Sequence, residues 1–471
     1  MSDTRLDILA HRRGSLSAPA GCGKTQLICS AISQNNDGKP ALILTHTNAG
    51  RAALEQRLRH PSGKGANAAR VATIDSWAIH LVQCFPQRSG LSSAVLSMRG
   101  SSASYAAIRQ GALRILTAGH ANAILLATYS RIIVDEYQDC GALQHQMVVA
   151  LADLLPTVVL GDPLQVIFDF AAPVVDWHRE VIVAFPPLVW TPAPWRWKNA
   201  NSHELGDWLL NVVRPSLSRQ NGSIDLTNAP GAVEWVRLDG TGAQKNETRL
   251  AAAKRNFAGT ALIIADAKNK ETQWDTARRA RATMVEANDM ADFMKFAAAF
   301  NPATATSLDD AVNFFGNLLS GLSPKRLIAR ARSLHAGRAK TGASSIEASA
   351  LAYLRSPSYR SAADMLDALQ RISGVFAFRP DVARLCSKAL RTVSDTVDFP
   401  TAALRERERF RHMPRALRAK SVGSTLLLKG LEADVAVITA PETMNAQNLY
   451  VAMTRGSKRL IICSTSPVLT V

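Results

Sequence analysis

The 471 residues are enough for roughly two to four domains of about 100–200 residues each, and 47% of them are hydrophobic, as is ordinary for domains with apolar cores. No apolar run reaches the roughly 18 residues that cross a bilayer, and residues 1–13 lack the apolar segment of an export signal, so we expect a cytoplasmic protein without a membrane partner. The formal charge of +17 favours a polyanionic partner, and the six cysteines, none of them in a Cys-x-x-Cys pair, favour reduced thiols over a zinc site.

Apolar strands alternate with amphipathic helices along the N-terminal part of the chain. We predict strands over residues 41–45, 70–74, 131–134 and 157–160, and helices over 25–33 and 49–59. A second set of strands is predicted over 188–190, 233–236, 262–265, 435–439 and 460–463. Such alternation predicts an α/β fold with two parallel-sheet domains, in which helices cover both faces of each sheet.

Two helical insertions interrupt these sets of strands. The predicted division is a first domain of residues 1–77 and 126–194 with an insertion of 78–125, and a second domain of 195–270 and 413–471 with an insertion of 271–412. Residues 321–420 hold 20 Lys and Arg against 8 Asp and Glu, so one fifth of the chain carries most of the excess positive charge. This basic stretch favours nucleic-acid contact, and a solvated helical surface is the alternative.

A glycine-rich loop precedes the first predicted helix. Small residues in this position let backbone N–H groups curl around phosphate oxygens, and the positive end of the following helix adds to the attraction. Lys24 would reach the β- and γ-phosphates of ATP, and the hydroxyl of Thr25 would hold Mg²⁺. The residues predicted to cradle the nucleotide are Ala20, Gly21, Cys22, Gly23, Lys24 and Thr25.

Two adjacent carboxylates follow the apolar run 132–134. Unpaired carboxylates are costly to desolvate, so a buried strand does not end in Asp135 and Glu136 for reasons of packing. A divalent cation would compensate the charge. We therefore predict that Asp135 holds Mg²⁺ and that Glu136 accepts the proton of the water that attacks ATP.

The run Asp135-Glu136-Tyr137-Gln138-Asp139 resembles motif II of the UvrD/Rep branch of superfamily-one helicases. Six further segments resemble the other motifs of that family in the same order: Leu44–Asn48 with Ala52–Leu58, Thr73–Trp77, Leu160–Gln165, Trp195–Arg196, Lys429–Glu432 and Leu449–Arg455. The resemblance covers most of the chain and implies two RecA-like domains with ATP between them.

The resemblance also implies roles for residues around the nucleotide. Gln165 would sense the γ-phosphate, and Arg196 would contact it together with Arg455, the arginine finger. Trp195 would stack on adenine, and Glu432 would lie near the ribose.

The sequence departs from the family pattern at several positions. No glutamine upstream of the phosphate loop matches the adenine-reading residue of the family, and Gln26 is the substitute that we consider. His46 replaces a common Phe, and Ala171 and Leu426 stand where Arg and His are usual. The last two changes affect the coupling of ATP to the grip on DNA, so they favour hydrolysis more than efficient unwinding.

Single strands are bound by basic grooves that carry stacking aromatic side chains. Our candidates for stacking on bases are His46, Trp77, Phe168 and Phe170, and core packing is the alternative for each. Asn48 and Thr73 are candidates for hydrogen bonds to phosphates.

Two functional hypotheses follow. The first is a 3′-to-5′ translocase and helicase that acts on single-stranded DNA or DNA junctions. The second is a DNA-sensing ATPase subunit with a nuclease partner, similar to the short UvrD-like helicase that accompanies an OLD-type nuclease in the Gabija antiphage system. The sequence leaves open the choice between DNA and RNA, the oligomeric state and the biological pathway.

Overall fold

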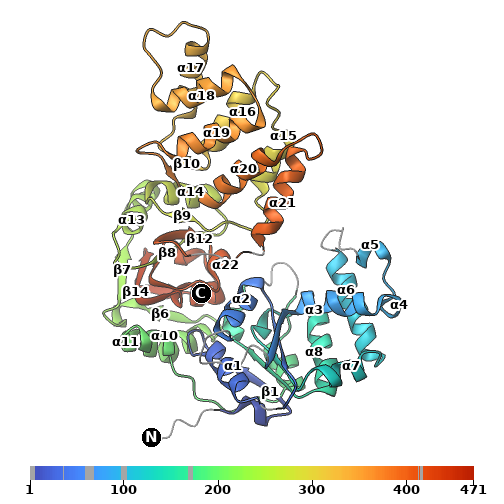
Figure 1. Cartoon of the computed structure of the whole chain (residues 1–471). Coiled ribbons are helices and arrows are strands. Elements are labelled where there is room, and N and C mark those ends of the chain that lie inside the picture. Colours follow the sequence, from blue (N-terminus) through green and yellow to red (C-terminus); the bar gives the residue numbers. More distant parts are fainter. Residues whose placement is uncertain are drawn as a thin grey trace. The chain divides into compact units, whose positions relative to one another are not determined.

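The chain divides into two units, each of which contains one large parallel sheet (Figure 1). The computed structural model describes residues 6–35, 37–58, 68–96, 103–167, 173–411, 413 and 417–471. The first unit comprises Met1–Ala232, Met444–Lys458 and Val468–Val471, and the second comprises Val233–Thr443 and Arg459–Pro467. The four-part domain division proposed from the sequence stays a prediction.

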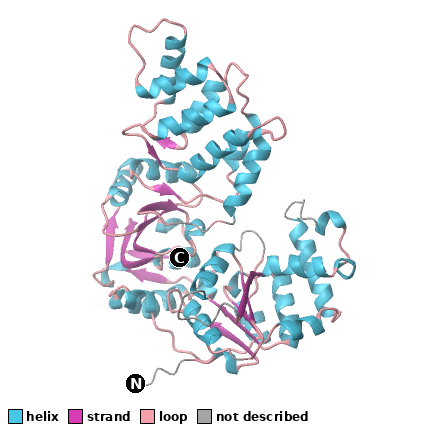
Figure 2. Ribbon diagram, viewed as in Figure 1, coloured by secondary structure: helices cyan, strands magenta, loops and turns pink. Residues whose placement is uncertain are grey.

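The sheet of the first unit has five strands in the order β1-β5-β4-β2-β3, all paired in parallel. Figure 2 draws strands in magenta and helices in cyan. The strands are β1 (Arg13–Ser17), β2 (Ala41–Thr45), β3 (Ala69–Thr73), β4 (Ile132–Val134) and β5 (Thr157–Gly161). Because parallel strands end at the same edge of a sheet, the segments that follow β1, β4 and β5 gather there. This edge therefore receives the phosphate loop, the acidic pair and the turn that carries Gln165.

Helices cover both faces of this sheet. Alternate residues of β2 point to opposite faces, so Leu42 and Leu44 join one apolar cluster while Ile43 joins the other. The helices between and after these strands are α1 (Lys24–Ser33), α2 (Asn48–Leu58), α3 (Ile74–Cys84), α4 (Pro86–Ser89), α5 (Ser93–Leu96), α6 (Ala103–Thr117), α7 (Asn122–Thr128) and α8 (Ala142–Leu154). The four strands predicted here are confirmed to within one residue at each end.

The remainder of the first unit is made of short elements. They are α9 (Ile182–Ala184), α10 (Trp195–Asn199), α11 (His203–Trp208), α12 (Arg214–Leu217) and α23 (Ala446–Met453), with β6 (Ser223–Asp225) antiparallel to β15 (Val468–Thr470). The strand predicted at 188–190 is wrong. Pro187 forms an isolated bridge to Ser15, and the pair Pro186-Pro187 supplies no N–H groups for a continuous ladder.

The sheet of the second unit has six strands in the order β7-β14-β13-β8-β12-β9. Their bounds are β7 (Val233–Arg237), β8 (Ala261–Ile264), β9 (Thr283–Met284), β12 (Lys420–Gly423), β13 (Ala433–Ile438) and β14 (Gly456–Ser464), and the helices α13 (Gly242–Lys254), α14 (Lys270–Arg279) and α22 (Thr425–Leu428) lie between them in the chain. The α/β fold with two RecA-like parallel-sheet domains is thereby confirmed. The sequence did not predict β9 and β12, which are short.

Among the described residues, seven helices separate β9 from β12 and surround an apolar core of their own. They are α15 (Ala291–Ala299), α16 (Ser307–Gly316), α17 (Pro324–His335), α18 (Ser345–Arg355), α19 (Tyr359–Gln370), α20 (Pro380–Thr392) and α21 (Phe399–Arg411), with the small hairpin of β10 (Leu319–Ser320) and β11 (Phe376–Ala377). The bounds predicted for this insertion, 271–412, stay a prediction, and β9, which lies within them, pairs with β12 in the sheet. Within the described residues, every helix is too short or too polar to cross a membrane.

Candidate nucleotide site

The phosphate loop has the backbone of an anion cradle. Gly21 (φ 68°) and Gly23 (φ 89°) adopt left-handed conformations that favour glycine, and α1 begins at the next residue, Lys24. A Cβ on Gly21 would lie 2.6 Å from the ring of Trp197, and one on Gly23 would lie 3.1 Å from the ring of Trp195. The loop is therefore held between the helix that it starts and α10.

Lys24 points to the acidic pair. Its Nζ lies 3.3 Å from Glu136 Oε1 and is buried without a hydrogen-bond partner among the described residues. Burial lowers the pKa of Lys24, but the carboxylates of Glu136, Asp135 and Asp162 outweigh burial and raise it. A charged ammonium group with unused donors at the mouth of this loop is suited to a phosphate.

The acidic pair stands directly after β4. Asp135 accepts a hydrogen bond from the backbone N–H of Glu136 (3.0 Å), and its pKa is raised to about 6, first by burial and then by the charge of Glu136. Glu136 adopts a left-handed backbone (φ 55°, ψ 40°), which costs a non-glycine residue strain of about 1–3 kcal/mol. Backbone strain and a buried carboxylate beside a second, half-buried one favour a functional role over a packing role.

These groups fit a magnesium ion. Two adjacent carboxylates near one ammonium group leave buried negative charge that a divalent cation would neutralise. Mg²⁺ prefers carboxylate and hydroxyl oxygens, which Asp135 and the half-buried Thr25 supply.

Gln138 connects Glu136 to the neighbouring strand. Its Nε2 donates to Glu136 Oε2 (2.6 Å), and its Oε1 accepts from the backbone N–H of Asp162 (2.9 Å), directly after β5. The side chain is only 1% exposed. The glutamine in the motif thus fixes the orientation of the predicted general base, a role that the sequence alone did not reveal.

Gln165 and Arg455 meet beside this network. Gln165 Nε2 donates to Asp162 Oδ2 (2.8 Å), and its Oε1 lies 3.5 Å from Arg455 Nη2. Arg455 is held at the end of α23, where Nε donates to Val451 O (2.9 Å) and Nη2 to Thr454 Oγ1 (3.1 Å). The structure thus brings together two residues that are 290 positions apart in the chain.

Trp195 and Arg196 lie on α10 against the phosphate loop. The backbone N–H of Arg196 donates to Gly21 O (3.0 Å), and its Nη1 donates to Thr454 O (2.5 Å). The Trp195 ring is 44% exposed, and Lys198 Nζ lies 5.2 Å from its centroid. One exposed aromatic face next to the loop agrees with the predicted stacking on a base.

The structure gives less support to the nucleotide contacts predicted for Gln26, Glu432 and Cys22. Gln26 is exposed, and its Nε2 lies 3.4 Å from Ser30 Oγ on the same helix. Glu432 is exposed in the second unit, so its place near the ribose stays a prediction. Cys22 is buried in the loop, and burial followed by the charge of Asp162 raises its pKa to about 12. Its thiol therefore stays protonated, which agrees with a small packing residue.

The predicted DNA contacts have mixed surroundings. Thr73 caps α3, because its Oγ1 accepts from Ser76 N (3.0 Å), and Trp77 is 6% exposed within the core. His46 and Asn48 are half-buried after β2. Phe168 and Phe170 lie outside the described residues, as does Ala171. The DNA-binding set stays a prediction, and the burial of Trp77 favours the packing alternative for that ring.

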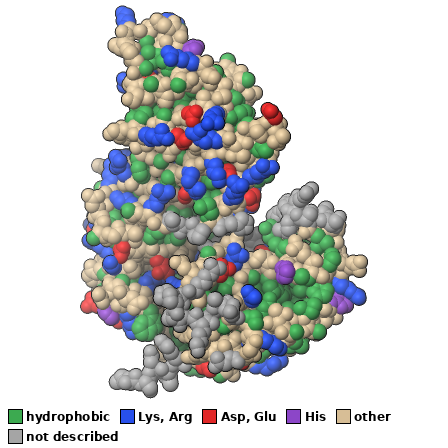
Figure 3. All heavy atoms as spheres, in the orientation of Figure 1, with side chains coloured by type: hydrophobic (Ala, Val, Ile, Leu, Met, Phe, Trp, Pro, Cys, Tyr) green, Lys and Arg blue, Asp and Glu red, His purple; other side chains and the backbone are tan. Residues whose placement is uncertain are grey.

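Some of the arginines in the basic stretch of the second unit form ion pairs with acids. Figure 3 shows Lys and Arg side chains interspersed with Asp and Glu on the visible face. Ion pairs join Arg330 to Glu347 (3.1 Å) and Arg411 to Glu408 (3.1 Å). Such pairs favour the alternative of a solvated surface for these arginines.

Two further residues of the site, Arg214 and Tyr450, were not assigned a role from the sequence. Arg214 donates to Asp162 Oδ1 (2.6 Å), and the hydroxyl of Tyr450 accepts from the backbone N–H of Ala20 (3.2 Å). Tyr450 lies within the run that resembles the last family motif, and this was its only signal. Arg214 lies in no motif.

Residues 6–171 match the family model AAA_19, which is described as an AAA domain. The matched segment contains the five strands of the first sheet, the phosphate loop and the acidic pair, and it ends before α10 and α23. The match supports the UvrD/Rep superfamily and indicates a P-loop ATPase domain that binds nucleotide. No curated protein matches the chain.

Proposed function

We propose that the protein is an ATP-dependent DNA translocase and helicase of UvrD type that moves 3′ to 5′ along single-stranded DNA. The observation that carries this proposal is the contact between Gln165, after β5, and Arg455, just after the end of α23, near the Lys24–Glu136 pair. A protein that only binds a nucleotide does not need an arginine placed to contact the γ-phosphate.

The side chains have separate tasks in this proposal. Glu136 accepts the proton of the attacking water, and Lys24 holds the β- and γ-phosphates. Arg196 and Arg455 stabilise the charge that develops on the transferred group, and Gln165 senses whether that group is present. When bound, Mg²⁺ would neutralise phosphate charge between Thr25 and Asp135.

The proposal is tested by ATPase and strand-displacement assays on the purified chain. We expect ATP hydrolysis to rise with single-stranded DNA more than with single-stranded RNA. We also expect displacement of a strand from a duplex with a 3′ tail, but not from one with a 5′ tail. Hydrolysis that is indifferent to both nucleic acids would contradict the assignment as a motor.

A second function is a DNA-sensing ATPase subunit in a nuclease complex of antiphage defence, as in the Gabija system. The burial of Trp77 favours it, because one candidate for gripping the strand is committed to the core. ATPase activity stimulated by DNA without strand displacement, together with displacement or nuclease activity once a partner is added, would support this second function.

A further inference from the structure

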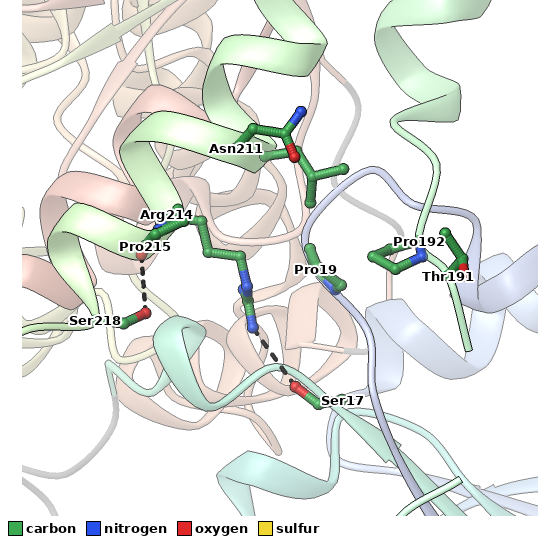
Figure 4. Close-up of a pocket in the computed structure, with 9 residues that line it drawn as sticks. Ser17, Pro19, Thr191, Pro192, Asn211, Arg214, Pro215 and Ser218 are labelled. Atoms are coloured by element: carbon green, nitrogen blue, oxygen red, sulfur yellow. Dashed lines mark hydrogen bonds between the residues drawn. The ribbon is translucent and has the colours of Figure 1, made fainter. Parts of the chain in front are cut away.

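Arg214, at the start of α12, joins three segments of the nucleotide site without belonging to any motif. Its Nη1 donates to Asp162 Oδ1 (2.6 Å) and to Tyr450 Oη (3.2 Å). Its Nη2 lies 3.5 Å from Ser17 Oγ, a contact drawn in Figure 4. The Asp162 side chain is fully buried, and that of Arg214 is 18% exposed. Burial lowers the pKa of Arg214, but the charge of Asp162 outweighs burial and raises the pKa, so the guanidinium group stays charged.

Asp162 connects Arg214 to Gln165. One carboxylate oxygen accepts from Arg214, and the other accepts from Gln165 Nε2 (2.8 Å). A carboxylate with both oxygens engaged has one orientation. The amide of Gln165 is thereby held with its Oε1 toward Arg455.

Tyr450 links Arg214 to the phosphate loop. Its hydroxyl accepts from the backbone N–H of Ala20 in the phosphate loop (3.2 Å) as well as from Arg214. Arg214 therefore contacts both Asp162, which holds Gln165, and Tyr450, which contacts the phosphate loop.

We propose that Arg214 is a positioning residue that sets the orientation of Gln165 through Asp162 and supports the phosphate loop through Tyr450 during nucleotide hydrolysis. This inference rests on the proposed ATPase function. Without Arg214, the buried carboxylate of Asp162 loses this charged partner and is free to turn away from Gln165. A variant without Arg214 should lose turnover more than affinity for the nucleotide, because Lys24 and the backbone N–H groups of the phosphate loop remain to bind the phosphates.

The structure offers a direct route to a test by chemical rescue. Arg214 lines an open pocket of about 430 Å³ together with Ser17, Pro19, Asn211 and Pro215 (Figure 4). In Arg214→Ala, the space of the missing guanidinium group joins this pocket. Methylguanidinium from solution can therefore reach Asp162 without entering the phosphate loop.

The experiment compares the full-length wild type with Arg214→Ala, Arg214→Lys and the control Arg219→Ala. Arg219 is exposed beyond the end of the same helix, so its removal changes the net charge equally. We expect kcat for ATP in Arg214→Ala to fall about 10-fold to 100-fold with little change in KM, as is typical when a supporting partner of a site is lost. Methylguanidinium, far below denaturing concentrations, should restore part of this kcat and leave wild type and Arg219→Ala unchanged.

A wild-type kcat in Arg214→Ala would overturn the proposal, and so would a fall that appears equally in affinity and turnover and is not rescued. If the alanine variant does not fold, Arg214→Lys decides. Reduced kcat at unchanged KM supports the proposal, and wild-type kcat overturns it. An inactive wild type would refute the proposed ATPase function instead.

Discussion

Replacing Gln138 with Leu tests how the catalytic glutamate is held in place. The substitution removes a charge-assisted hydrogen bond to Glu136 (2.6 Å) and leaves the buried backbone N–H of Asp162 without its acceptor (2.9 Å). A bond to a charged group contributes about 1.5–3 kcal/mol, and an orphaned buried donor costs about 1–3 kcal/mol. We therefore expect the free energy of unfolding to fall by about 2.5–6 kcal/mol.

The same change should reduce turnover, because Glu136 loses the group that orients it. General-base catalysis contributes about 10²-fold to 10⁴-fold, and a base that is present but disoriented should lose roughly tenfold of this. The assay is ATP turnover with single-stranded DNA at saturating nucleotide, with urea unfolding of the same samples.

Gln144 provides a matched control for Gln138. It is 2% exposed, donates to the carboxylate of Asp75 (3.1 Å) and accepts from the backbone N–H of Gly141 (3.0 Å). Gln144→Leu thus removes the same kinds of bond away from the acidic pair and should lose similar stability while keeping kcat. Equal kcat in the two variants would refute a positioning role for Gln138.

Two further predictions concern buried charges. The pKa of Asp135 is raised from 3.8 to about 6 by burial and Glu136, so this carboxyl group binds more protons in the native state than in the unfolded state between these pH values, and its own contribution to stability without nucleotide should fall as pH rises from 4 to 6. Asp135→Asn should remove this fall, which we expect to be roughly 1–3 kcal/mol in urea unfolding. In the second unit, Arg379 donates to both oxygens of the buried Glu286 (2.7 and 2.8 Å), so Arg379→Met should cost about 3–5 kcal/mol in urea unfolding. Adding Glu286→Gln should recover part of that loss, and a double variant no more stable than the single would contradict the reasoning.

The place of the candidate site at one edge of the first sheet was predictable from the sequence, because parallel strands all end at the same edge. Once the strand before Asp135 and the loop before Lys24 were recognised, both had to lie at the carboxyl ends of one sheet, and the structure places Lys24 3.3 Å from Glu136. This deduction needs only the alternation of strands and helices.

The burial of Trp77 could have been predicted from the spacing of apolar residues, but the family resemblance pointed to DNA instead. Ile74, Trp77, Ala78 and Leu81 recur at helical spacing and form the buried face of α3. That periodicity predicts packing of the tryptophan in the core, whereas the motif resemblance suggested contact with DNA.

The contacts of Gln138 and Arg214 could not be predicted in the same way. Arg214 contacts Asp162 and Tyr450, which lie 52 and 236 positions away in the chain, and its own segment has no periodicity or motif that marks it. Such pairings depend on how short helices settle against a sheet edge, and local sequence does not encode that position.

The most direct test of the account is ATP turnover by Glu136→Gln. The amide keeps the size of the side chain that lies between Lys24 and Gln138, but it cannot accept a proton from water. We predict that kcat falls by about 10²-fold or more while nucleotide and single-stranded DNA still bind. Hydrolysis at the wild-type rate would contradict the assignment of Glu136 as the general base, and with it the catalytic role of the acidic pair.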